Sequence, residues 1–399
     1  MEFELQDDHV EVRDLAAKIF SDLAGLDRVV EVETHEAGFD RTLYGVLADS
    51  GMLGIAVPEA DGGAGLGLLG LVALLEQQGR RLAAVPLWSV VAGAALPIAE
   101  FATEEQAGRW LPGLLEGTSI ITGAFDAAPG ERAALRGRLQ GDDLVVSGEV
   151  LHVPAGGVAD AVVVPVALDD GSLRVAVVPT TAAGLGLTPI SVTSHENAAT
   201  GTFAEVVVSG ADLLPADGQE VVDWTRARIR VALAAVQVGV CAEALRITAE
   251  YTSQRVQFGR PISTNQAVSN RAADCYLDTE AIRLTTYKAA WLLDSGAEAA
   301  ARSASLVAKW WAATGGLRVV LSGQHLHGGI GADITYPIHR YFLWGRQLAC
   351  YLGGAEATAA ELGDTLETAP AVGASARVPA NGSSAPSHGR PGLRSSVPS

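Results

Sequence analysis

Apolar residues recur with a helical period in the first part of the chain. Asp7 and Asp8 precede apolar positions at a spacing of two to four residues, which predicts a helix with these aspartates at its cap. The apolar positions are Val10, Val12, Leu15, Ile19 and Leu23. A glycine-rich turn over 62–70 separates this segment from a second predicted helix over 71–78. Residues 1–117 are therefore predicted to form an N-terminal helical domain.

The pattern changes to short runs of β-branched residues between 118 and 222. These runs cover 144–147, 161–165, 173–178 and 204–208. Turn-forming Gly and Asp residues separate them at 141–143 and 169–171. Short apolar runs bounded by such turns predict a small antiparallel β-barrel or sandwich as the middle domain.

Helical spacing returns after Asp223. Small and apolar residues keep a spacing of three to four over 231–249 and again over 281–291, which predicts a helical bundle over 223–366. The final segment, 367–399, is rich in Pro, Gly, Ser and Ala and has no periodic apolar face. It is predicted to be a disordered tail, and a solvated tail is favoured over a docking arm. The expected fold class is α+β, mainly α.

Composition narrows the class of protein without identifying it. The 399 residues carry a net charge of -18, which argues against nucleic acid as a partner because phosphate binding needs a basic face. Residues 1–8 lack the features of a secretory signal, and the apolar run 66–75 is shorter than the about 20 residues of a membrane span. A cytoplasmic protein without a membrane segment is expected. Three cysteines without C-x-x-C spacing predict buried packing residues and no metal site.

Four motifs occur in a fixed order along the chain, and the first three contain glycine. The segments are 53–59 with Gly62, Gly63 and Gly65, then 251–262, then 326–331, and finally 336–340. Together they resemble the acyl-CoA dehydrogenase family over about residues 1–366. This resemblance implies an N-terminal helical domain, a middle antiparallel β-barrel and a C-terminal four-helix bundle. It also implies FAD as the cofactor and α,β-desaturation of an acyl-CoA thioester.

The family's catalytic glutamate has no counterpart here. Counting from Tyr336 and Pro337 places Leu352 at the usual glutamate position, and Ile229, just before Arg230, occupies the second position used in the family. A base must accept the α-proton of the substrate, which neither side chain can do. Glu356 lies one helical turn after Leu352 and is the alternative candidate for a relocated base, although that turn displaces its carboxylate by about 5 Å.

The flavin-contacting motifs also depart from the family. Residues 127–130 and 152–155 stand where the family carries T-E-P-x-A-G-S-D and W-I-[TS]-N. The hydroxyl groups are missing, and Pro154 removes a backbone donor. The comparison with the family implies that this chain does not hold a flavin ring in its own cleft.

The other half of the family's cofactor site is retained. The matching positions are Arg255, Gln257, Phe258, Gly328 and Gly329, with His325 at the family's glutamine position. In the family these groups reach the pyrophosphate and adenosine of FAD bound by a neighbouring subunit. An arginine fork suits phosphate oxygens, and glycines allow close backbone approach.

Retention of this half alone resembles the non-catalytic partner of paired actinobacterial dehydrogenases. The resemblance implies an α2β2 assembly with a catalytic subunit and a bulky, steroid side-chain acyl-CoA as substrate. Two alternatives stay open: a self-sufficient dehydrogenase that uses Glu356, and a flavin-free structural homologue.

Overall fold

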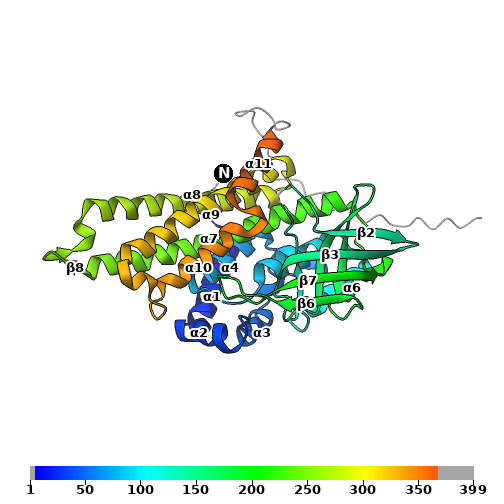
Figure 1. The fold of residues 1–399 in the computed structure, drawn as a ribbon, viewed down its shortest axis with the longest axis horizontal. Helices are drawn as coiled ribbons and strands as arrows, with labels where there is room; N and C mark the ends of the chain where they lie inside the picture. The colour runs from blue at the N-terminus through cyan, green and yellow to red at the C-terminus, as the bar shows by residue number, and fades with distance from the viewer. Residues whose placement is uncertain (1–4, 129, 367–399) are drawn as a thin grey trace, which may run out of the picture.

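The computed structural model describes residues 5–128 and 130–366. Helices make up most of the molecule, and a curled β-sheet lies at one end (Figure 1). The long helices of the C-terminal region run away from the sheet. The α+β, mainly α, prediction is confirmed. The predicted disorder of the tail concerns residues outside those described.

The N-terminal region is helical, as predicted. Its α-helices are α1 (Asp7–Leu23), α2 (Leu26–His35), α3 (Arg41–Asp49), α4 (Gly67–Arg81), α5 (Leu96–Phe101) and α6 (Glu104–Leu115), and a π-helical segment, Trp88–Ala95, precedes α5. The N-cap of α1 is Gln6, so the predicted cap was wrong by one residue. Asp7 and Asp8 lie in the first turn instead, where their negative charges stabilise the positive end of the helix dipole. Leu15 is exposed, whereas Phe20 is buried in its place.

The middle region forms one seven-stranded sheet. Its strands are β1 (Ile121–Gly123), β2 (Leu135–Gln140), β3 (Asp143–Pro154), β4 (Ala161–Leu168), β5 (Leu173–Pro179), β6 (Leu185–Pro189) and β7 (Ala198–Val208). The antiparallel prediction is confirmed for β2–β3, β3–β7, β4–β5 and β6–β7. It was wrong for β4 against β1 and β2, because these two strands share one edge of β4 and both run parallel to it.

The C-terminal region is the predicted helical bundle. It contains α7 (Gly218–Gln254), α8 (Gln266–Asp294), α9 (Glu298–His327), α10 (Ile338–Cys350) and α11 (Gly354–Leu366), with a hairpin of β8 (Val256–Gln257) and β9 (Arg260–Pro261). A Cβ atom added to Gly239 would lie 2.0 Å from the carbonyl oxygen of Glu76, so glycine permits the close crossing of α7 and α4.

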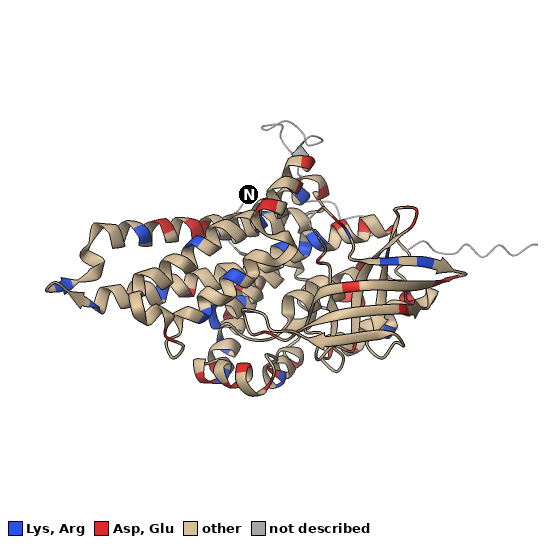
Figure 2. Cartoon of the chain, viewed as in Figure 1, with Lys and Arg blue, Asp and Glu red and all other residues tan. Residues whose placement is uncertain are grey.

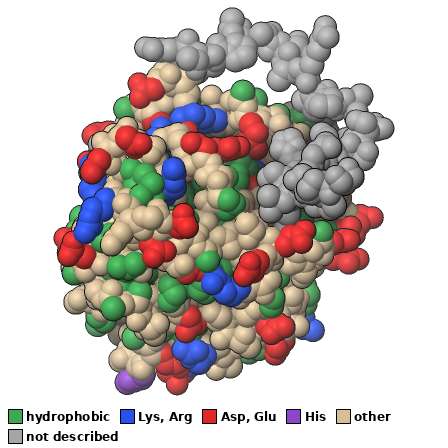
Figure 3. Space-filling model, turned by 90° about the vertical axis from the view of Figure 1, so that its right-hand side faces the viewer, with side chains coloured by type: hydrophobic (Ala, Val, Ile, Leu, Met, Phe, Trp, Pro, Cys, Tyr) green, Lys and Arg blue, Asp and Glu red, His purple; other side chains and the backbone are tan. Residues whose placement is uncertain are grey.

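One described helix, α7, has the length and mean hydropathy of a membrane span. However, 72% of its apolar window is buried inside the protein. Such burial is typical of a central core helix, and α4, α8 and α9 supply the neighbours of α7. The face at the sheet end carries acidic side chains scattered among basic and apolar ones (Figure 3).

Candidate functional site

A short turn between α10 and α11 carries Leu352, the first of the two residues predicted to replace the family's base. Leu352 has left-handed backbone angles, φ 55° and ψ 37°, which are uncommon for leucine. Its N–H group donates a 2.7 Å hydrogen bond to Oδ1 of Asp126. Leu352 and Ile229 are both buried in the same apolar core. The structure therefore surrounds both family base positions with apolar side chains.

The buried side chain of Lys309 binds the end of α10, directly before this turn. Lys309 has no exposed surface, and its Nζ donates to the carbonyl oxygens of Leu348 at 3.0 Å and Ala349 at 3.1 Å. Burial lowers the pKa of Lys309 to about 8, although the nearby Asp126 carboxylate opposes this change. The ammonium group thus binds carbonyls at the C-terminal end of α10 and fixes where the turn begins.

Aromatic side chains fill the place where the family comparison puts a flavin ring. The Tyr351 ring lies between Trp88, at 5.2 Å between centroids, and His152, at 4.8 Å. Together with Pro154 and Glu196, these side chains line a cavity of about 20 Å³. Sites for ligands of cofactor size usually have about 300–1,000 Å³. The residues present do not fit a flavin ring here.

Glu196 is an acidic group in that cavity which the sequence did not indicate. Burial raises the pKa of Glu196 to about 7, while the nearby hydroxyl group of Ser194 acts in the opposite direction. Its Oε2 atom is buried and has no hydrogen-bond partner among the described residues. By contrast, Glu356, the predicted alternative base, lies exposed on α11. The structure therefore places the Glu356 carboxylate in solvent and not in the apolar surroundings of Leu352.

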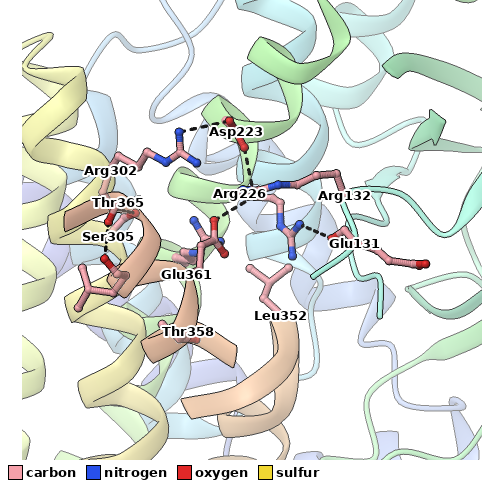
Figure 4. A network of polar contacts seen from close by, with 12 residues as sticks. Glu131, Arg132, Asp223, Arg226, Arg302, Ser305, Leu352, Thr358, Glu361 and Thr365 are labelled. Carbon is pink, nitrogen blue, oxygen red and sulfur yellow. Dashed lines mark hydrogen bonds and ion pairs between the residues drawn. The ribbon is translucent and has the colours of Figure 1, made fainter. Parts of the chain in front are cut away.

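An arginine cluster lies beside Leu352, where α7, α11 and the segment before β2 meet (Figure 4). Arg230 donates through Nη2 to Oε2 of Glu361 at 2.5 Å, and Arg132 donates through Nη1 to Oε1 of the same carboxylate at 2.9 Å. Arg226 donates to the carbonyl oxygen of Glu131 at 3.2 Å. The sequence does not predict a functional role for any of these residues.

The retained half-site lies at the other end of the bundle, on the β8–β9 hairpin and the end of α9. Phe258 is 99% exposed and has a left-handed φ of 53°. Arg255 and Gln257 are also exposed, and the ribbon at this tip is coloured for basic residues in Figure 2. The Phe258 ring is therefore available for contact with another molecule.

The two sequence segments of this half-site lie next to each other. The hydroxyl group of Tyr251 donates to the carbonyl oxygen of His327 at 3.3 Å, and their rings stack at 4.4 Å. Gly328 follows directly, and a Cβ atom added to it or to Gly329 would meet nothing within 4 Å. His325 is exposed near the end of α9. Open glycines beside an exposed arginine fit a pyrophosphate group approaching from outside the chain.

A larger groove of about 500 Å³ lies beside this half-site, between α2, α4, α7 and α10. Its lining includes Tyr251 and Tyr336 as well as Arg246. Arg246 pairs with Glu243 at 2.8 Å and with Glu250 at 3.0 Å. Because its guanidinium is already neutralised, Arg246 does not make the groove a phosphate site.

Metal and thiol chemistry find little support in the described residues. Among these, no group of three or more His, Cys, Asp or Glu side chains could hold a metal ion. Cys241 and Cys275 are buried, as predicted, and burial raises the pKa of both thiols. Cys350 is exposed, so the prediction that all three pack in the interior was wrong for this residue. It ends α10 on the face turned away from the core.

Two family models match the chain. The acyl-CoA dehydrogenase N-terminal domain model matches residues 6–118, and the C-terminal domain model matches residues 216–366. Among curated proteins, the acyl-CoA dehydrogenase FadE27 of Mycobacterium tuberculosis is 35% identical over 350 residues, which cover 86% of this chain and 92% of that protein. FadE28 of the same organism is 32% identical over 316 residues, covering 77% and 87%.

Two solved structures of dehydrogenase complexes are similar in fold and sequence. A chain of the Tcur3481-Tcur3483 steroid ACAD G363A variant has a TM-score of 0.85 at 43% identity and covers 91% of this chain and 98% of its own. A chain of the ChsE4-ChsE5 complex from Mycobacterium tuberculosis has a TM-score of 0.87 at 34% identity and covers 93% and 100%.

Proposed function

The chain belongs to the acyl-CoA dehydrogenase family, and from this premise we propose that it is the subunit that completes the FAD site of a separate catalytic chain. One observation carries the proposal. The ring cleft of this chain is filled by Trp88, Tyr351 and His152, whereas Phe258 and Arg255 stand exposed and unused at the other end of the bundle. The similar structures named as a ChsE4-ChsE5 complex and a Tcur3481-Tcur3483 steroid ACAD support a heteromeric assembly.

In this proposal the two chains divide the chemistry. Bound FAD would supply a hydride acceptor for the β-carbon of an acyl-CoA thioester, and a carboxylate of the catalytic chain would remove the α-proton, since Leu352 cannot. In this chain, Arg255 places its positive charge against the pyrophosphate, and Gly328 and Gly329 let the backbone approach it. Phe258 covers the adenosine side from solvent. The assembly is an α2β2 heterotetramer, and its substrate class is a bulky acyl-CoA of the steroid side-chain type.

Flavin content tests the proposal directly. The chain is purified alone and then after co-expression with a candidate catalytic chain, and flavin absorbance is measured together with molecular mass by light scattering. Yellow protein only in the mixed assembly is the expected result. Stoichiometric FAD and acyl-CoA oxidation by this chain alone would refute the partner role, and a colourless mixed assembly would favour a structural homologue.

A single variant then tests the exposed half-site. Phe258→Ser should weaken FAD retention in the mixed assembly by about 30-fold, because buried aromatic contacts at an interface contribute about 2 kcal/mol. The stability of the isolated chain should not change, since Phe258 packs against nothing within it. Leu15→Ser, at another exposed apolar position, is the matched control. Equal FAD retention in the two variants would contradict the assigned role of the hairpin.

A further inference from the structure

Two arginines of α7 are buried one helical turn apart. Arg226 is 6% exposed and Arg230 is 3% exposed. Like charges at this spacing repel each other, and a buried guanidinium that lacks an anion loses its hydration without compensation. The position of these two arginines therefore requires a nearby negative charge. Arg132, from the segment before β2, adds a third guanidinium to the same place.

The carboxylate of Glu361 binds two of the three arginines. Glu361 of α11 binds Arg230 through one oxygen and Arg132 through the other. Asp223 lies 3.2 Å from Arg132 and is shared with Arg302 of α9 at 3.5 Å (Figure 4). Arg226 itself has no ion pair at contact distance among the described residues, and the charges of Glu361, Asp126 and Asp223 act on it from farther away.

Arg226 supplies the second indication of an anion site. Its Nη1 atom donates to the carbonyl oxygen of Glu131, but its buried Nε atom has no hydrogen-bond partner among the described residues. A guanidinium has five N–H donors, so Arg226 retains donor capacity toward the centre of the cluster. An unsatisfied buried N–H group of this kind is unfavourable unless an acceptor binds it.

The Arg230–Glu361 pair is ionic at neutral pH. Burial lowers the pKa of Arg230 to about 10, which is still above neutral, and burial also lowers the pKa of Arg226. Burial acts to raise the pKa of Glu361, yet Arg230 and then Arg132 hold it below its ordinary value. The Glu361 contacts are therefore ionic, and their geometry is that of a guanidinium–carboxylate site.

The cluster lies among the positions that matter most for the family's chemistry. Leu352 projects toward it (Figure 4), and Ile229 directly precedes Arg230. Arg132 follows residues 127–130, which replace a flavin-contacting motif. Glu361 thereby fastens α11 across the region that holds the base in active members of the family.

We propose that Arg132, Arg226 and Arg230 form a carboxylate-binding site, and that Glu361 is its built-in occupant and fastens α11 over the turn that carries Leu352. The site itself follows from the contacts. The further step, that α11 keeps the acyl cleft of this subunit closed, rests on the proposed function. Small carboxylates such as acetate or formate are the external ligands that the emptied site would take.

Removing the occupant and adding it back tests the site. Glu361→Ala should lower the thermal unfolding midpoint of the isolated chain by about 6 °C, because it leaves buried guanidinium groups unpaired. Acetate should raise that midpoint with a saturable dependence, compared with chloride at equal ionic strength. Hydrogen exchange of the α11 amides should become faster in Glu361→Ala and slower again with acetate. Glu356→Ala, an exposed acid of the same helix, is the matched control.

Further variants keep the test decisive. If Glu361→Ala does not fold, Glu361→Gln keeps the shape of the side chain without its charge; a lowered midpoint with little response to acetate is expected, because the amide still fills the site. Arg226→Met combined with Glu361→Ala should reduce the response to acetate. Equal acetate effects in Glu356→Ala and Glu361→Ala, or a wild-type midpoint for Glu361→Gln, would overturn the proposal. These measurements need neither flavin nor partner, so their outcome is independent of the partner assay.

Discussion

Replacing Lys309 by methionine should change how the stability of the chain depends on pH. Lys309 is fully buried, and among the described residues its ammonium group binds backbone carbonyl oxygens and no carboxylate at hydrogen-bond distance. Methionine has a similar length and no charge. The variant therefore removes one titrating group and leaves the other groups that titrate above pH 8 in place.

The size of the effect follows from the pKa of the buried amine. Burial lowers it from 10.5 to about 8, and at about 1.4 kcal/mol for each pKa unit the difference corresponds to about 3 kcal/mol. Below pH 8 the folded chain carries the whole unfavourable effect of burying the charge. Between pH 8 and 10.5 the folded state has released the proton while the unfolded state still binds it, so stability rises with pH.

The measurement is urea unfolding of both proteins at several pH values between 7 and 10. The free energy of unfolding of the wild type, minus that of Lys309→Met, should rise by more than about 2 kcal/mol across this range, because most of the window lies below pH 10. Tyrosine, cysteine and arginine groups are common to both chains and cancel in the difference. A difference that stays constant, or falls, would refute the reasoning about a buried charged lysine.

Two further variants test the site and the packing. Glu356→Gln should leave turnover of the mixed assembly and the stability of the chain unchanged, because the side chain is exposed on α11; loss of turnover with the fold intact would restore it as a relocated base. Gly239→Ala should destabilise the chain by about 2 kcal/mol in urea unfolding, since its Cβ would lie 2.0 Å from a carbonyl oxygen of α4. Gly108→Ala in α6, where an added Cβ meets nothing within 4 Å, is the control and should stabilise slightly; similar values for the two would contradict the close-approach argument.

Local patterns predicted most of the fold because helices and strands bury their faces with fixed periods. The runs at 161–165 and 204–208 became β4 and β7, and the spacing over 231–249 became part of α7. The parallel contacts of β4 could not be predicted in this way, since alternation along a strand does not identify its neighbours. The burial of Phe20 in place of Leu15 also depends on which helix lies opposite.

The candidate site was predictable only where its residues lie in one motif. The prediction that Leu352 occupies the family's base position comes from counting along the chain, and the hairpin with Phe258 lies in one contiguous motif. The arginine cluster joins residues that are 229 positions apart between Arg132 and Glu361, and no local pattern contains that information. Lys309 could have been suspected, since it is the single charged residue between Arg302 and Arg318 in the mostly apolar middle of α9.

The two ends of α7 are too far apart to belong to one small-molecule site. Ile229 and Arg255 are 26 residues apart, which at 1.5 Å per residue is about 39 Å along the helix. A site of about 300–1,000 Å³ is only about 7–10 Å across, so one small-molecule site does not reach both ends. Substitutions at the filled end therefore leave the exposed end intact. Evolution can therefore change the residues at one end of this helix without changing the selection that acts on the other end.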